Sequence, residues 1–425
     1  MSLSDISSFL VQNFHSTFLP SVTNVLVTIS PVVLSIFLFI LAWNLWVDYV
    51  RGKNFLSLKY TVLELKLPKE TFKSPLAMET ILHSFHNTAD GSKYAQYWKG
   101  ETRPWYSLEM ISVEGQVKFL IWTEDRRKVV AMNALYSQIP GIEVYEREDY
   151  TKSVQFDPKV NRIWAGEFVK TKADPYPIKT YIDYGLDRDP KEEFKVDPLT
   201  HILEFLGSVK PNQQVWIQIL IRAHKDEQRK LGKLFETEDA WKEKARSEVD
   251  KILMRDPKTK VAGTKDEATG FTKLPTISKG EQNVVEALER SITKLPFDVG
   301  IRALYIAPKD TFDTPFGIGG IISGFKQFNS ESLGGFKPNG KKWHGRFNGL
   351  PWEDYKNMRR NRYSRLALLA YRRRSFFYTP FPSKPIVLNT EELATVYHFP
   401  GSVAATPNIE RVPSKKSTAP ANLPI

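Results

Sequence analysis

The alternation of apolar and polar residues divides this chain into one continuous apolar run and a longer region of mixed elements. Residues 22–50, VTNVLVTISPVVLSIFLFILAWNLWVDYV, contain one Pro and one charged residue. A helix needs about 20 apolar residues to cross a hydrocarbon core about 30 Å thick. The run therefore predicts a single transmembrane helix over 22–50.

The charges around this run predict its orientation. The first fifty residues contain no Lys or Arg, whereas Arg51 and Lys53 follow at once. Basic residues near a span stay on the cytoplasmic side, so we expect residues 1–21 outside and the remainder in the cytoplasm. Trp43, Trp46 and Tyr49 fit an interfacial aromatic belt. A signal peptide would have a basic start and a shorter apolar core, so we expect a retained, single-pass inner-membrane anchor.

Residues 58–150 show a first set of alternating elements. The alternation predicts a strand over 60–67, and Ser74-Pro75 is typical of a helix start. A hairpin follows over 106–123 with its turn at Glu114-Gly115. The predicted elements, in order, are a strand at 60–67, a helix at 74–86, strands at 106–113 and 116–123, a helix at 125–138 and a strand at 142–148.

Residues 151–310 repeat this order. We predict a strand at 179–186, a helix at 197–209, a strand at 214–223, a helix at 280–295 and a strand at 297–307. Strand, helix, strand, helix, strand is the order of ferredoxin-like units. The repeated order could be a coincidence. However, in both halves the first helix starts with a capping residue followed by Pro, and a Pro follows the second helix. We therefore expect an α+β protein with two tandem ferredoxin-like units and a charged insertion, 224–279, of one or two helices followed by a loop.

The region 311–400 is expected to be helical and basic, and 401–425 to form a disordered or extended tail. Residues 354–377 predict a helix with interleaved tyrosines. Its cations suit nucleic-acid phosphates, the inner lipid leaflet or an acidic partner, or merely a solvated face. The candidate contact residues are Arg359, Arg360, Arg362, Arg365, Arg372, Arg373 and Arg374.

The charge balance favours an anionic partner without identifying it. The chain has 60 Lys and Arg against 48 Asp and Glu, a net charge of +12. Asp5 and Asp48 are the only charged residues before Arg51, so the positive excess lies entirely after the predicted span. There is no Cys, which excludes disulfides and thiolate metal sites.

Two motifs resemble a phosphate-binding loop and a metal site, but each lacks residues that such a site needs. Gly317–Gly324, GIGGIISG, has no Gly-Lys-Ser/Thr and is better interpreted as close helix packing or a turn. His83 and His86 have helical spacing, with Glu79 four residues earlier, but no further ligand completes a metal site. We expect no catalytic residues, no metal and no cofactor.

The C-terminal run NTEELATVYHFPGSVAATPNIERVPSKKSTAPANLP resembles the segment that precedes the motor domain in conjugation coupling-protein-like ATPases of the FtsK/HerA type. The runs YSQIPGIEVYEREDY and PLTHILEFLGSVKPNQQVWIQILIR are similar to the upstream region of such chains. The matching positions are Glu391, Glu392, Leu393, His398, Phe399, Pro400, Gly401, Thr406, Pro407, Asn408, Pro420, Asn422, Leu423 and Pro424.

This resemblance implies an apparatus of the type IV secretion or conjugation kind, with a motor that moves DNA or protein. The chain carries no Walker A motif, so the implied ATPase would be encoded separately, or else the gene is split or the chain truncated before its motor. We therefore expect a non-catalytic anchor that docks this ATPase, as a homo-oligomeric ring and with DNA or lipid at the basic helix. The expected docking residues are Glu391, Glu392, His398, Phe399, Pro400, Asn422, Leu423 and Pro424. The alternatives are an enzyme with a site between the two units and a scaffold unrelated to transport.

Overall fold

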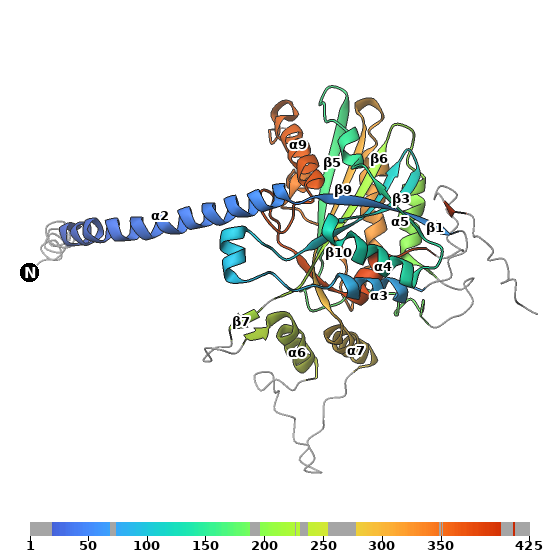
Figure 1. Ribbon diagram of the computed structural model, residues 1–425, viewed down its shortest axis with the longest axis horizontal. Coiled ribbons are helices and arrows are strands. Elements are labelled where there is room, and N and C mark those ends of the chain that lie inside the picture. Colours follow the sequence, from blue (N-terminus) through green and yellow to red (C-terminus); the bar gives the residue numbers. More distant parts are fainter. Residues whose placement is uncertain are drawn as a thin grey trace, which may run out of the picture. The chain divides into compact units, whose positions relative to one another are not determined.

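The computed structural model describes residues 19–68, 74–187, 196–225, 227–229, 237–253, 278–347, 350, 352–400 and 411–412. It is a mixed α+β structure, as the sequence predicts (Figure 1). The chain divides into two compact units. The first comprises residues up to Ser57 together with Asp90–Thr102. The second, which we call the sheet unit, comprises Leu58–Ala89 and the chain from Arg103 onward.

The first unit is built on one long helix. Helix α2 (Leu19–Ser57) contains Pro31, and Thr28–Ser57 is long and apolar enough to cross a membrane. Side chains 28–46 are all classed as exposed within the chain, although the rings of Trp43 and Trp46 contact Tyr97 and Trp98. The π-helix η2 (Ala95–Lys99) packs on α2. The length and position of this helix agree with the span predicted from the sequence.

The first half of the second unit has the elements that the sequence predicts. They are β1 (Tyr60–Pro68), α3 (Leu76–Phe85), β2 (Trp105–Val113), β3 (Gln116–Glu124), α4 (Lys128–Gln138) and β4 (Glu143–Arg147). The strands lie in the order β4-β1-β3-β2, and each neighbouring pair is antiparallel. The turn at Glu114-Gly115 places both residues at positive φ, which glycine tolerates best.

The second half has the same strand order, but several of its elements are not those expected. They are β5 (Asn161–Lys170), α5 (Pro198–Gly207), β6 (Gln214–Ala223), β9 (Pro296–Pro308), α8 (Gly320–Lys326) and β10 (Phe336–Pro338). The order is β10-β5-β9-β6, again with antiparallel neighbours. Two split βαβ connections, β5-α5-β6 and β9-α8-β10, generate this arrangement as they do in the first half.

The predicted strand at 179–186 is wrong, because this segment forms turns. Its backbone is held locally: the Asp183 carboxylate accepts from the Thr180 backbone N–H at 2.8 Å, and the Tyr184 N–H bonds the Thr180 carbonyl. The first strand of this half is instead β5. Helix α8, rather than the predicted helix at 280–295, occupies the position of the second helix.

Gly317–Gly324 packs closely, as interpreted from the sequence. The π-helix η7 (Pro315–Gly319) continues into α8. A Cβ on Gly317, Gly320 or Gly324 would overlap Tyr305, Phe205 or Ile202. These glycines therefore allow α8 to approach β9 and α5.

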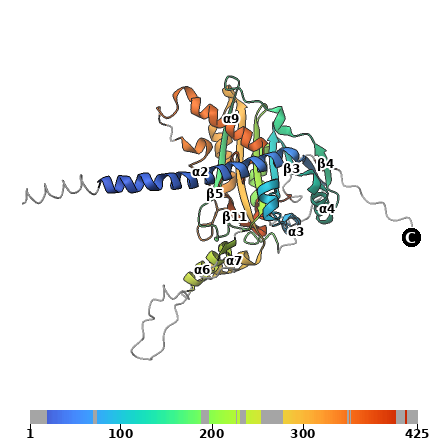
Figure 2. The same ribbon diagram turned by 60° about the vertical axis from the view of Figure 1, so that its left-hand side comes forward.

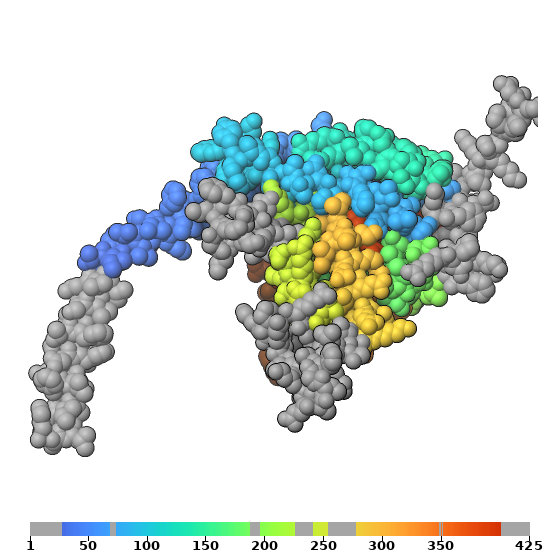
Figure 3. All heavy atoms as spheres, turned by 90° about the horizontal axis from the view of Figure 1, so that it is seen from below, coloured from blue at the N-terminus to red at the C-terminus, as the bar shows by residue number. Residues whose placement is uncertain are grey.

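The charged insertion between β6 and β9 folds as a separate small layer. It contains β7 (Glu227–Arg229), β8 (Thr237–Asp239), α6 (Ala240–Ile252) and α7 (Lys279–Thr293). Figure 3 shows α6, in yellow-green, beside the gold α7. A cluster of Val249, Val284, Val285, Leu288 and Leu333 joins them. The predicted loop after α6 lies outside the described residues.

The two halves form one continuous sheet. Strand β2 pairs antiparallel with β6 from Trp105–Arg222 to Val113–Gln214, with Glu109 opposite Gln218 at the centre. The sheet runs from β10 through β5, β9, β6, β2 and β3 to β1, with β4 also on β1. Two more strands pair at its sides, β11 (Ile386–Asn389) with β9 and β12 (Arg411–Val412) with β1.

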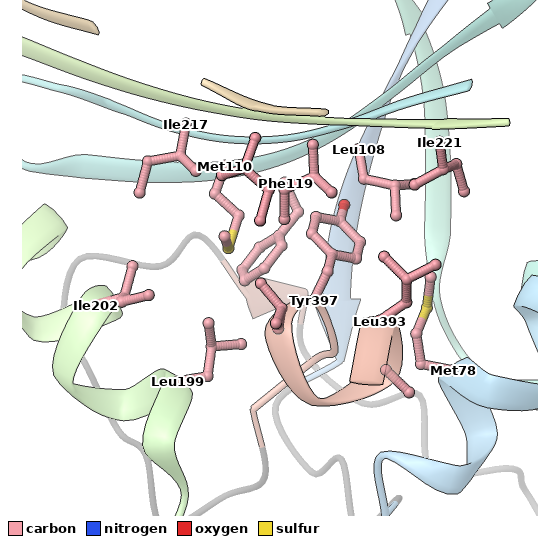
Figure 4. Packing of buried hydrophobic residues seen from close by; sticks show 14 of the residues in the cluster. Met78, Leu108, Met110, Phe119, Leu199, Ile202, Ile217, Ile221, Leu393 and Tyr397 are labelled. Atoms are coloured by element: carbon pink, nitrogen blue, oxygen red, sulfur yellow. The ribbon is translucent and has the colours of Figure 1, made fainter. Parts of the chain in front are cut away.

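One face of the sheet carries the main hydrophobic core. Helices α3, α4, α5 and α8 contribute to a single cluster with the strand residues of this face. Helix α10 (Thr390–Val396) lies between α3 and α5: Leu393 and Tyr397 point toward the sheet beside Met78 and Leu199 (Figure 4). The segment 386–399 therefore fills the space beneath the seam where the two halves join.

The opposite face carries a row of buried polar residues. The cross-strand register aligns Glu64, Glu109, Gln218, Arg302 and Glu167 on five of six neighbouring strands, with Leu120 of β3 between Glu64 and Glu109. Helix α9 (Met358–Arg372) and the chain after it cover this face (Figure 2). Arg374 is 1 % exposed, and its guanidinium donates to Glu109 at 3.0 Å and also binds Asp149.

Replacement of Arg374 should show how far the stability of the buried polar row depends on this cation. In Arg374→Ala, Glu109 and Asp149 would lose their cation, which should lower the free energy of unfolding by about 3–5 kcal/mol. Arg373→Ala, at the exposed neighbour, should change it by no more than about 0.5 kcal/mol. Urea unfolding of the full chain in detergent measures both. Equal effects of the two variants would contradict the assignment.

Candidate polyanion-binding surface

Helix α9 has a buried stripe and a basic stripe. Ser364, Ala367, Leu368 and Tyr371 recur at intervals of three, one and three residues and are buried. The side chains on the opposite stripe are exposed: Arg359, Arg362, Arg365, Leu369 and Arg373. A helix repeats every 3.6 residues, so the four arginines project from one side.

Asp354 organises the first turn of this helix. Its carboxylate accepts from the backbone N–H of Arg359 at 2.7 Å and of Arg360 at 3.1 Å, and it lies 3.6 Å from the Arg360 guanidinium. These contacts satisfy N–H groups that have no partner inside the helix. They also place a negative charge at the positive end of the helix dipole.

His344 attaches the middle of α9 to the sheet. Its Nδ1 accepts from the Ala165 N–H at 3.0 Å, so Nε2 carries the proton and donates to Ser364 Oγ at 3.3 Å. Ser364 Oγ in turn donates to the Ile163 carbonyl at 2.9 Å. Burial lowers the pKa of His344 to about 4, and the nearby Arg360 and Arg162 act in the same direction. The ring is therefore neutral at physiological pH.

The C-terminal end of α9 is fixed by buried polar contacts. The Tyr371 and Tyr150 hydroxyls lie 2.8 Å apart, and Tyr150 donates to Glu109 at 2.9 Å. Arg372 donates to the backbone carbonyls of Thr151 and Val154. Burial favours the neutral acid, but the charge of Arg374 holds the pKa of Asp149 below its usual value.

The seven arginines predicted as a contact set therefore separate into two groups. Arg374 is buried and Arg372 binds backbone carbonyls, so the prediction of a nucleic-acid or lipid contact is wrong for Arg374 and unsupported for Arg372. Arg360 pairs with Asp354. The side chains of Arg362, Arg365 and Arg373 make no hydrogen bond or ion pair with any other described residue. Together with Arg359 they form what we call the α9 surface.

Exposed aromatic and apolar side chains border the α9 surface. Trp352 is 78 % exposed, and Tyr355 and Met358 are also exposed. Arg346 extends the basic region, with its guanidinium 3.4 Å from the Tyr363 hydroxyl. Arginine and lysine bind phosphates, and exposed rings offer stacking surfaces for bases. Sequence reasoning identified the arginines but missed Trp352 and Arg346, which lie outside the helix.

The segment expected to dock a motor is buried where it is described. Glu391 and Glu392 are almost fully buried: Lys170 Nζ lies 2.9 Å from Glu392, and Arg290 Nε lies 3.1 Å from Glu391. His398 pairs with Asp197 at 3.0 Å. Phe399 and Pro400 are buried as well. These residues serve the chain's own core and form no surface, contrary to the expectation; Asn422, Leu423 and Pro424 lie outside the described residues.

Two further candidates are present in the described part of the chain. A cavity of about 440 Å³ is lined by Lys179, Asp183, Asn283, Glu286 and Arg290, among others. It lies within the second half of the sheet unit and not between the two halves. The second candidate is the histidine pair at the C-terminal end of α3. His83 is exposed, and His86 Nε2 bonds the Pro296 carbonyl at 3.1 Å. No group of three or more His, Asp or Glu with metal-site geometry occurs among the described residues.

Residues 57–412 match a protein family described as "Domain of unknown function (DUF8128)". The chain belongs to this family. The matched range begins at the last residue of α2 and includes both halves of the sheet, α9 and α10. No curated protein matches the chain.

Protonation of His344 should loosen the attachment of α9. Because the pKa of about 4 lies below the ordinary value of 6.5, the unfolded chain binds this proton first as the pH falls. Stability should therefore fall between about pH 6.5 and pH 4, by up to about 3 kcal/mol from this group. His344→Asn retains an acceptor for Ala165 and should show a flatter slope of Tm against pH. Identical slopes in the two proteins would refute this role.

Proposed function

We propose that this chain is a non-catalytic, membrane-anchored component of a type IV secretion or conjugation-like apparatus. In this proposal α2 crosses the inner membrane with its N-terminus outside, and the sheet unit lies in the cytoplasm. The length and exposed apolar surface of α2 support the anchor, and the absence of Lys and Arg before Arg51 supports the orientation. The resemblance of 389–424 to FtsK/HerA-type chains supports the apparatus.

The α9 surface carries the assignment of an anionic partner, which we propose is DNA. Arg362, Arg365 and Arg373 extend from a helix that is held rigidly by Asp354, His344 and Glu109. A cation without an internal partner breaks no ion pair when it binds a phosphate, and a rigid helix adds no backbone ordering to the cost of binding. The exposed Trp352 and Tyr355 add rings of the kind that stack on unpaired bases.

We also propose that each half of the sheet is a ferredoxin-like unit. The orders β4-β1-β3-β2 and β10-β5-β9-β6 support this. So does the placement of each half's two helices on the same face. In this arrangement the second ferredoxin-like unit carries residues 224–295 as an insertion between its second and third strands.

Removal of the three unpaired arginines should weaken DNA binding and its dependence on salt. Each phosphate contact contributes about 0.9 to the slope of log K against log salt for duplex DNA. The triple variant Arg362→Gln, Arg365→Gln, Arg373→Gln should therefore lower this slope by about 2–3. Lys244→Gln, Lys279→Gln, Lys326→Gln removes the same charge elsewhere and should change it little. Fluorescence anisotropy of labelled DNA across a salt series measures both.

The same variants distinguish DNA from a lipid surface. If the arginine variant binds DNA like the wild type but loses binding to vesicles containing phosphatidylglycerol, the DNA assignment is wrong and α9 faces lipid. If neither ligand is affected, the α9 surface is not the site of an anionic partner.

The motor partner and the orientation can be tested together. Inside-out inner-membrane vesicles that carry the chain should bind an FtsK/HerA-type ATPase encoded beside it, whereas right-side-out vesicles should not. Vesicles without the chain are the control. Absence of binding to inside-out vesicles would overturn the docking role, and binding to right-side-out vesicles would overturn the orientation.

A further inference from the structure

An aromatic cluster near the C-terminal end of α2 connects residues 43–49 with residues 90–102. The α2 rings of Trp43 and Trp46 contact rings of residues 90–102: the Trp43 and Tyr97 centroids lie 5.6 Å apart, and those of Trp46 and Trp98 5.5 Å apart, edge to face. Tyr49 lies 6.2 Å from Trp46. The sequence showed only the α2 rings, because the second group comes from a segment inserted between α3 and β2.

Backbone contacts hold this second segment firmly on α2. The Trp46 indole N–H donates to the Tyr97 carbonyl at 3.2 Å, and the Asn54 side-chain amide donates to the Gly100 carbonyl at 3.0 Å. Gly100 has φ +72°, and a Cβ there would lie 2.5 Å from the Val50 carbonyl oxygen. Only glycine fits this close approach, so the position of the segment along α2 is fixed.

Three rings in or beside this cluster are more than half exposed. Tyr94 and Trp98 are 64 % and 54 % exposed, and Tyr49 is 64 % exposed. Lys93 and Lys99 flank them and are also exposed. Amphipathic rings beside cationic side chains are the composition of the membrane–water interface, where the ring is buried and the polar atom and the ammonium group remain hydrated.

The depth of these rings along α2 indicates that lipid covers them. From Thr28 to Trp46 the helix rises about 27 Å at 1.5 Å per residue, close to the roughly 30 Å hydrocarbon core. From Trp46 to Tyr49 the helix rises about 4.5 Å further, into the headgroup layer. If α2 spans the bilayer, the rings that pack on Trp43 and Trp46 are held at the same depth.

We propose that residues 90–102 are a second membrane-contacting element, which with Trp43, Trp46 and Tyr49 forms an aromatic collar that binds the phospholipid interface. This inference rests on the proposed anchor role of α2. The collar gives the sheet unit three chain connections to the membrane-bound part, after Ser57, before Asp90 and after Thr102.

The absence of native cysteine makes a direct test available. Nitroxide labels are attached to single-cysteine variants of the full chain, Tyr94→Cys and Trp98→Cys, in phosphatidylcholine–phosphatidylglycerol vesicles. Accessibility to oxygen and to a water-soluble nickel chelate is measured by electron paramagnetic resonance. Phe37→Cys reports the anchor itself, and Lys244→Cys, on exposed α6, reports water.

We expect labels at 94 and 98 to favour oxygen over nickel, with ratios between those at 37 and 244. If position 37 reports lipid while 94 and 98 both match 244, the collar is overturned and the anchor stands. If position 37 also matches 244, the anchor fails and the collar fails with it. Tyr94→Cys leaves the Trp46–Trp98 contact intact, so a local disturbance by Trp98→Cys does not obscure the result.

Discussion

The antiparallel pairing of β2 with β6 is the constraint on which the rest of the sheet unit depends. Each strand would be the open edge of its own half, and unpaired edges are aggregation sites. Joining them buries both edges and makes two small sheets into one. The same pairing brings Glu109 opposite Gln218 on one face, and on the other face it leaves space beneath the seam that α10 fills with Leu393 and Tyr397.

The buried row of charges connects this seam to the molecular surface. Glu109 lies on the seam and needs a cation, and Arg374 supplies it from the end of α9. Tyr150, Tyr371 and Arg372 extend the network along the same helix. The outer arginines of α9 are therefore presented by a helix whose inner side is fixed to the centre of the sheet. Burying ions is costly unless they are paired, so this face depends on its full set of partners.

How much the sequence reveals depends on where the partners of a residue lie. The first half was predictable because its strands alternate and because Ser74-Pro75 and Glu114-Gly115 are local signals. Strand β5 was missed because Gly166 and the buried Glu167 interrupt its apolar residues. The outward stripe of α9 follows from helical spacing, but Arg374 and Glu109 are 265 residues apart. Glu391 and Glu392 look like surface residues by composition, and their burial depends on distant partners, among them Arg290 and Lys170.

The distance between β2 and β6 along the chain has a consequence for synthesis. Glu109 and Gln218 are 109 residues apart, and ribosomes add about 5–20 residues per second. The edge of β2 would therefore remain unpaired for roughly 5–20 s after it emerges. By then α2 has already left the ribosome, so an anchored nascent chain would spend this interval at the membrane surface. During that interval the open edge of β2 would be available for pairing with another chain, so the order of synthesis sets how long this edge stays exposed.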